Sequence, residues 1–390
     1  MGKRQELLKQ AREHIFSLAP RDLAAALAFE NMSLGLGKMF HVLDGKTFCV
    51  FGPDGTITRN TDRWQSGFGY GGVIKWEGDD VAFPEIRPNG CGMILVKLHE
   101  MPDEKELFER VSSLNNSSLT LNGTLIKPDF GKGNHFFEFY TPTEVSPDME
   151  SQLPRDATYS ILHCSSPERK PLIYDAFQDE GWTSTPLGMF HMLEGKTARD
   201  YLRIWQEFES FCKKRRALLM KEVTGSFKII SNETHQGLFG ANEIRLGCYR
   251  ASDNTLFPVA LRWDLPVYIM QGIQNLSRDL LKKLRFQKRA ERLGLVDDLI
   301  DINILPHGGG YKLLIPYTDL KVHRLKEVQY FSLQEPEQAG GEISRYGRIV
   351  FSSPRELPYD YRGKKVIRKT IEYKLGEPVA KLQPVMTLKV

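Results

Sequence analysis

Side chains that can bind a metal ion recur at the ends of strand-like segments, each beside glycine or another small residue. A neutral imidazole is a suitable ligand for manganese, zinc or iron, and a thiolate can cap or bridge the same ion. A single histidine in such a position is more often a structural residue with a hydrogen-bond partner. The prediction of a metal site therefore depends on the set as a whole, which is Cys91, His135, His163 and His235.

The segment "GKGNHFFEF", residues 131–139, places an Asn-His pair at the start of a short apolar strand. Strand alternation sends His135 and Phe137 to one face and Asn134 and Glu138 to the other. One strand can thus contribute polar side chains to two neighbouring sites.

The segment "PHGGGY", residues 306–311, places three glycines directly after His307. Glycines let the backbone approach a bulky ligand closely and leave amides free to hold phosphate oxygens. An ordinary glycine-rich turn after proline is the alternative interpretation, and this motif alone does not decide between them.

The elements that must position these residues form a mixed pattern. Short apolar runs alternate with glycine-rich turns between residues 37 and 97, and helices interrupt the strands without regular βαβ alternation. We therefore expect an α+β fold of mixed, largely antiparallel sheets with flanking helices, in one domain spanning residues 1–390. Helical spacing predicts helices over residues 4–18, which Pro20 ends, over residues 21–32, and over residues 195–222 with a basic end at 213–216. A further helix is predicted from Ser277 as N-cap to Gly294, and its seven cations indicate a solvated face or a phosphate-contacting surface.

Composition excludes some classes of protein. The 390 residues are 41% hydrophobic and 26% charged, which is enough for a large core. No run approaches the roughly 18 apolar residues of a membrane span, and the N-terminus does not resemble a signal peptide, so a soluble, cytoplasmic protein is expected. The five cysteines lack any C-x-x-C pair, which argues against a disulfide framework or a zinc ribbon. The net charge of +4 permits a polyanionic partner.

Taken in order, the polar segments resemble the RtcB family of manganese- and GTP-dependent RNA ligases. The family's Asp-x-His-Gln-Gly, Asp-x-x-Cys-Gly and Gly-x-Gly-Asn-His-Phe-x-Glu motifs are similar to the segments containing Asp62, Cys91 and residues 131–138. Its later histidine motifs resemble the segments of His163, His235 and His307, and its C-terminal lysine corresponds to Lys389. The resemblance runs from about residue 60 to the end, and "GNHFFEF" is its most specific match.

The resemblance implies a role for each of these residues. Cys91, His163 and His235 would hold one Mn²⁺, and Cys91 with His135 would hold part of a second. His307 would attack GTP to form a histidine-GMP intermediate, and Asp62 would act near cyclic-phosphate opening or hydroxyl activation. The residues lining the nucleotide pocket would be Asn134, Glu138, Ser277 and Lys389. The reaction would join RNA 3′-phosphate or 2′,3′-cyclic phosphate ends to 5′-hydroxyl ends. The partners would be GTP and RNA, with an activating protein as an optional third, and no membrane.

Several positions depart from the family pattern. Pro88 stands where the family has a metal-bridging aspartate, and Trp64, Pro167 and Tyr311 replace a histidine and two arginines. Asn89 or Asp62 are the oxygen ligands that can compensate for the missing aspartate. Three functions stay open: a working RNA ligase, a metal-dependent RNA phosphoesterase or nuclease without self-guanylylation, and a non-catalytic protein that binds RNA ends.

Overall fold

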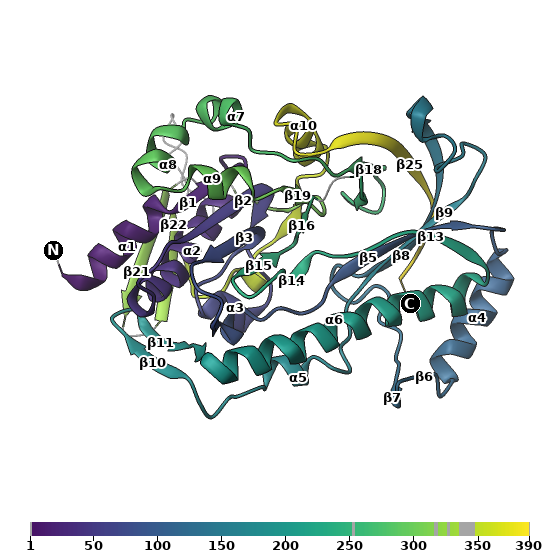
Figure 1. The fold of residues 1–390 in the computed structure, drawn as a ribbon. Coiled ribbons are helices and arrows are strands. Elements are labelled where there is room, and N and C mark those ends of the chain that lie inside the picture. The colour runs from purple at the N-terminus through teal and green to yellow at the C-terminus, as the bar shows by residue number, and fades with distance from the viewer. Residues whose placement is uncertain (1, 252–253, 316–318, 326–327, 335–347, 390) are drawn as a thin grey trace.

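The computed structural model describes residues 2–251, 254–315, 319–325, 328–334 and 348–389 (Figure 1). It is an α+β protein built mainly from antiparallel sheets, which confirms the predicted fold class. No helix in the described ranges combines the length and apolar character needed to cross a membrane. A single domain spanning residues 1–390 stays a prediction.

The larger sheet has seven antiparallel strands and is nearly closed into a barrel. Its two edge strands, β13 and β17, approach each other. In spatial order the strands are β13 (Phe227–Thr234), β5 (Gly92–Leu98), β9 (Tyr159–Cys164), β8 (Phe136–Val145), β25 (Glu377–Leu388), β18 (Val267–Gln271) and β17 (Leu256–Val259). The apolar run "GMILVKL" is thus β5, next to the edge strand β13, and its prediction as part of a sheet is confirmed.

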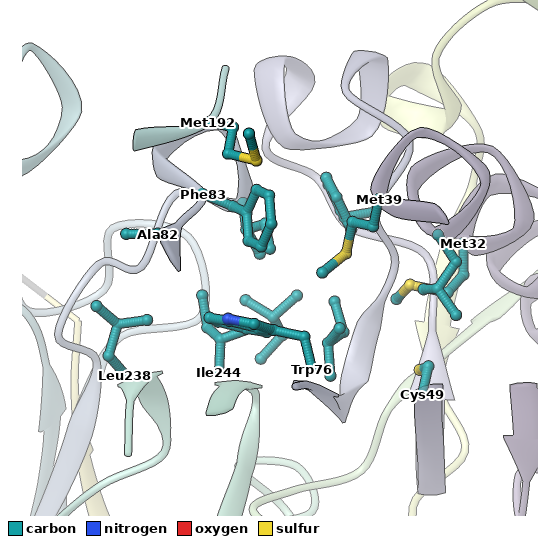
Figure 2. Packing of buried hydrophobic residues seen from close by; sticks show 14 of the residues in the cluster. Met32, Met39, Cys49, Trp76, Ala82, Phe83, Met192, Leu238 and Ile244 are labelled. Atoms are coloured by element: carbon teal, nitrogen blue, oxygen red, sulfur yellow. The ribbon is translucent and has the colours of Figure 1, made fainter. Parts of the chain in front are cut away.

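The second sheet has five strands, of which only the β1–β2 pair is parallel. In spatial order the strands are β1 (Ile15–Ser17), β2 (Thr47–Thr56), β3 (Tyr70–Trp76), β15 (Glu243–Leu246) and β14 (Gln236–Leu238). One face packs on helices α2 (Leu23–Val42) and α6 (Gly195–Thr224). Figure 2 shows this core, with Trp76 beneath Phe83 and the methionines of α2 beside it.

Helix α6 links the two sheets. Its N-terminal half buries Tyr201 and Trp205 against the five-stranded sheet, and its C-terminal half buries Phe211 and Leu219 against the seven-stranded sheet (Figure 1). The predicted amphipathic helix is confirmed and extends to Thr224. Its predicted basic end is only partly a solvated surface, because Arg215 and Arg216 are wholly buried.

The remaining elements surround these two sheets. The other helices are α1 (Lys3–Glu13), α3 (Thr61–Gln65), α4 (Glu104–Asn116), α5 (Pro171–Tyr174), α7 (Arg278–Lys283), α8 (Gln287–Leu293), α9 (Val296–Ile300), α10 (Lys364–Glu372) and the 3-10 turns η1 (Pro84–Ile86), η2 (Pro147–Met149) and η3 (Pro354–Glu356). The small sheets pair β4 (Val81–Ala82) with β12 (Leu193–Glu194), β6 (Thr120–Leu121) with β7 (Thr124–Leu125), β10 (Trp182–Thr185) with β11 (Gly188–His191), β16 (Cys248–Arg250) with β19 (Ile304–Pro306), and β20 (Tyr311–Leu313) with β24 (Tyr359–Tyr361). A three-stranded sheet contains β21 (Asp319–Leu325), β22 (Val328–Gln334) and β23 (Arg348–Phe351).

Three helix predictions had wrong boundaries. The helix predicted over residues 21–32 is α2, which begins at Leu23 and continues to Val42. The first helix ends at Glu13 rather than at Pro20, because the apolar segment that follows joins the sheet as β1 beside β2. The helix predicted from Ser277 to Gly294 is two helices, α7 and α8, separated where Arg285 adopts a left-handed φ of 60°. Its predicted ends are confirmed, since Ser277 caps α7 and Gly294 ends α8 with a φ of 65°.

Candidate functional site

The site lies where the chain passes from one sheet to the other. His235 stands between β13 of the seven-stranded sheet and β14 of the five-stranded sheet, and its backbone N–H donates to the carbonyl of Cys91, 3.0 Å away. Cys91 immediately precedes β5, whose next residues pair with β9 so that Met93 lies opposite His163. Antiparallel pairing therefore gathers side chains that are far apart in the sequence.

The four predicted metal ligands come together. Cys91 Sγ lies 3.3 Å from His135 Nε2, and His163 Nε2 lies 3.1 Å from His235 Nε2. The rings of His135 and His163 are 5.3 Å apart between centroids, so the two pairs adjoin. His307 completes the group, with its ring centroid 4.4 Å from that of His235.

Hydrogen bonds from Nδ1 turn two of these imidazoles toward the centre of the cluster. His135 Nδ1 donates to Asp129 Oδ2 at 2.7 Å, and His163 Nδ1 donates to the carbonyl of Asn134 at 2.9 Å. Because a carbonyl oxygen can only accept, Nδ1 of His163 carries the hydrogen. A ligating histidine usually makes such a bond with its second nitrogen, since the bond fixes the ring and its tautomer.

A buried arginine supports this arrangement. Arg215 of α6 pairs with Asp129 at 3.1 Å and with Glu168 at 2.9 Å, and all three side chains are buried or nearly so. Asp129 therefore lies between a cation and His135. Neither Arg215 nor Asp129 could be predicted as a site residue from the sequence, because nothing local to a basic helix end or to a loop aspartate indicates that the two meet.

The electrostatics favour an anionic thiol beside a protonated His135, with His163 and His235 neutral. Burial opposes ionisation of Cys91, but its contacts with His135 and His163 outweigh burial and hold the pKa of the thiol well below its usual value. Burial also lowers the pKa of His163, and burial together with His307 and His163 lowers the pKa of His235 strongly. For His135 burial is outweighed by Cys91 and Asp129, which raise its pKa to about 9.

The donor set fits a divalent transition metal in its chemistry. A thiolate and neutral imidazoles are such ligands, and the buried Nδ1 of His235 has no hydrogen-bond partner among the described residues. The contacts are pairwise, however, and within the described ranges no three His, Cys, Asp or Glu side chains form a ready-made metal site. Binding of an ion would therefore have to draw the Cys91–His135 and His163–His235 pairs together.

The compensating oxygen ligands are not positioned at the cluster. Asn89 Oδ1 accepts from the backbone N–H of Cys91 at 2.9 Å. Asp62 lies on α3 and pairs with Arg87 at 3.3 Å. It lines a separate cavity of about 650 Å³, away from the pocket that contains His307. The neighbouring Arg63 turns inward to bond the carbonyl of Ile86, and Asp62 is consequently turned outward.

His307 is held by an aspartate that the sequence analysis missed. Its Nδ1 lies 3.1 Å from Oδ2 of the buried Asp54. Asp54 lies within β2 where the register shifts between Phe51 and Thr56, and such a bulge re-aims a side chain. The segment "FGPDGT" has the composition of a turn, and the aspartate between proline and glycine is the feature of the sequence that could have pointed to Asp54 as a site residue. Because the carboxylate accepts from Nδ1–H, the Nε2 lone pair of His307 stays available.

The glycines after His307 are required by the packing of the chain itself. A Cβ on Gly308 would lie 2.6 Å from the carbonyl oxygen of Ala260, and one on Gly310 would lie 2.7 Å from that of Asp54. Gly310 also has a φ of 59°. The glycines thus keep His307 against Asp54, while a phosphate-binding role for their amides stays a prediction.

His307 opens into a pocket of about 90 Å³. Three of the four predicted nucleotide-binding residues line it: Asn134, Glu138 and Lys389. Burial raises the pKa of Glu138 to about 7, and Tyr140 donates its hydroxyl to that carboxylate. His135 precedes β8, contacts Cys91 in the cluster and also borders this pocket, so the segment contributes side chains to both of these adjoining places.

Ser277 does not join the other predicted nucleotide-binding residues. Its side chain is exposed and accepts from the backbone N–H of Leu280 at 3.3 Å, which caps α7. The hydroxyl is therefore engaged in capping the start of α7, and Ser277 is not among the residues that line the pocket of His307.

Comparisons with known proteins add no identification. No protein-family model matches this chain, and no curated protein matches it either.

Proposed function

We propose that this protein is a GTP-dependent RNA ligase with an RtcB-like catalytic domain, which joins 3′-phosphate or 2′,3′-cyclic phosphate RNA ends to 5′-hydroxyl ends. The observation that carries the proposal is the buried Asp54–His307 pair, next to a cluster of one cysteine and three histidines. A histidine with Nδ1–H fixed by a carboxylate presents Nε2 as a nucleophile.

His307 would act in both halves of the reaction. Its Nε2 lone pair attacks the α-phosphorus of GTP, an N–P bond forms, and the bond from that phosphorus to the leaving pyrophosphate breaks. An oxygen of the RNA 3′-phosphate then takes the GMP from Nε2. The 5′-hydroxyl oxygen of the second RNA end finally attacks the activated phosphorus and gives its proton to water, while the bond from that phosphorus to GMP breaks and GMP leaves. Asp54 would stabilise positive charge on the imidazole while the N–P bond exists.

Cys91, His163 and His235 would hold one Mn²⁺, and Cys91 with His135 would contribute to a second. Bound there, the ions supply positive charge that offsets negative charge on the phosphoryl oxygens. Asp129 would orient His135, and the carbonyl of Asn134 would orient His163.

Asn134, Glu138 and Lys389 would contact the nucleotide. A cavity of about 90 Å³ is smaller than the roughly 300–1,000 Å³ of most ligand pockets, so the side chains at its mouth must move to admit GTP. Glu138 would accept hydrogen bonds from the guanine edge in its ionised form.

The test is transfer of label from α-labelled GTP to the protein in the presence of Mn²⁺. We expect an acid-labile label on the wild-type protein and on a His99→Ala control, whose histidine is exposed elsewhere, and none on His307→Ala. Elemental analysis of the wild-type protein and of His163→Ala would measure the metal held by the cluster.

Pro88, which offers no ligand where the related enzymes have a carboxylate, favours the second candidate, a metal-dependent RNA phosphoesterase or nuclease. Metal-dependent turnover of RNA ends without a protein label would support that candidate. RNA-end binding with neither label nor turnover would instead indicate a non-catalytic protein.

A further inference from the structure

An exposed tryptophan stands at the pocket of His307. Of the five tryptophans, Trp64, Trp76 and Trp205 are at most 2% exposed, whereas Trp182 is 46% and Trp263 60% exposed. Trp263 lines the same pocket as His307, Glu138 and Lys389. A large aromatic side chain left in water at a pocket mouth is typical of a binding surface.

The segment that carries Trp263 is fixed to the turn that carries His307. The backbone N–H of Ala260 donates to the carbonyl of His307 at 3.1 Å. Gly308 and Gly309 pack so closely on the carbonyls of Ala260 and Leu261 that a Cβ on either glycine would overlap them. The backbone that leads to Trp263 is therefore held at a fixed place beside the backbone of His307.

A tight turn presents the indole. The backbone N–H of Leu265 donates to the carbonyl of Arg262 at 2.9 Å, which closes a turn with Trp263 near its tip. The guanidinium of Arg262 is engaged by Asp264 at 2.9 Å and by Asp360 at 3.3 Å. The charge of Arg262 is thus offset locally, and the indole face is the group that this turn offers to a ligand.

We propose that Trp263 is a stacking platform for the terminal base of the RNA whose 3′-phosphate enters the pocket. Glu138 is only 4% exposed and lies inside the pocket, whereas Trp263 lies at its mouth. A base stacked on the indole leaves its own 3′-phosphate to point inward toward His307. Every base has a π face, so the platform would hold RNA ends of any sequence.

The inference rests on the proposed function in taking RNA as the ligand, but its test needs neither catalysis nor metal. Fluorescence anisotropy would follow binding of a labelled oligoribonucleotide ending in a 3′-phosphate, in EDTA and without GTP. We expect Trp263→Ala to weaken binding about tenfold and Trp263→Phe to stay within about threefold of wild type, since phenylalanine also stacks. Trp182→Ala is the matched control with an exposed tryptophan in another cavity, and it should bind like wild type.

A second oligonucleotide, abasic at its 3′-terminal nucleotide, tests which base is held. Wild-type protein should bind it about tenfold more weakly than the intact RNA, and Trp263→Ala should cause no further loss, because the stacking partner is already absent. Equal affinity of wild type and Trp263→Ala for intact RNA would overturn the proposal. So would a Trp263→Ala variant that loses GTP binding while it keeps RNA binding.

Failure of this inference and failure of the proposed function give different results. A protein that forms the His307 label but binds RNA independently of Trp263 would be a ligase without this platform. A protein that binds RNA ends through Trp263 but never becomes labelled would retain the platform and lack the ligase reaction. Thermal melting of Trp263→Ala should match wild type, because the side chain is exposed.

Discussion

The buried Asp54–His307 pair gives the sharpest test of the proposed chemistry. Asp54→Asn keeps the shape of the side chain and removes its charge. Asp54 is 1% exposed, and its Oδ2 is the acceptor that keeps the hydrogen of His307 on Nδ1. In the variant the amide can present its NH₂ group to Nδ1, and the hydrogen then moves to Nε2, which removes the nucleophilic lone pair.

The expected loss follows from the strength of that bond. A buried hydrogen bond to a charged group contributes about 1.5–3 kcal/mol, which corresponds to roughly a 10- to 150-fold slower guanylylation. The free energy of unfolding of Asp54→Asn should be equal to that of the wild-type protein or higher. Asp54 Oδ1 has no hydrogen-bond partner among the described residues, so the substitution removes a buried charge that is incompletely paired.

The assay is the initial rate of label transfer from α-labelled GTP, with GTP binding measured in parallel. Asp54→Asn should label slowly, bind GTP like wild type, and unfold in urea at the wild-type concentration or higher. A variant that labels within about threefold of wild type, while His307→Ala does not label at all, would refute the role of Asp54 in setting the tautomer.

Three further outcomes are expected. Burial raises the pKa of Glu138 from 4.5 to about 7, so the folded state retains this proton better than the unfolded state. The melting temperature should therefore fall as pH rises from about 4.5 to 7, and Glu138→Gln should make it depend less on pH. Asp129→Asn should weaken binding of Mn²⁺ about 10- to 100-fold in a metal titration, since it removes the carboxylate that orients His135. Gly237→Ala should lower the free energy of unfolding by about 1–3 kcal/mol or more in urea denaturation, because its Cβ would overlap the buried ring of Trp205.

Each of these outcomes has a result that would contradict it. An unchanged pH slope in Glu138→Gln would mean that this carboxyl titrates normally. Metal affinity unaffected by Asp129→Asn would leave His135 without a positioning partner. Wild-type stability of Gly237→Ala would require α6 to shift freely, against the packing seen around it.

The sequence predicted the site best where a cysteine or histidine stands at the end of an apolar strand. Cys91, His135, His163 and His235 were grouped from their positions beside apolar strands, and antiparallel pairing then brings those strand ends together. The long α6 helix was equally predictable, because its apolar face repeats at helical spacing. In both cases neighbouring residues in the sequence carry the pattern, and the structure adds which of these segments lie side by side.

The rest depended on contacts between distant segments. Asp54 meets His307 across 253 positions of sequence and only because β2 bulges, which no local pattern announces. Arg215 belongs to a basic run that resembles a solvated surface, yet it is buried against Asp129, 86 positions away. Asp62 was predicted to belong to the site from a motif match alone. The motif could not show that the neighbouring Arg63 points into the protein and that Asp62 points outward, where it pairs with Arg87.

The buried polar cluster lowers the stability of the folded protein. Placing a thiol, several imidazoles and carboxylates in the interior opposes folding, and apolar side chains of similar volume would stabilise the same strand ends better. Some of the cost is offset, since Arg215 and Asp129 balance each other and support His135. The buried Nδ1 of His235 is left without a partner in the described chain, which packing alone does not explain. Polar groups kept at such a cost, and aimed at one another beside an open pocket, are what a binding or reacting centre requires.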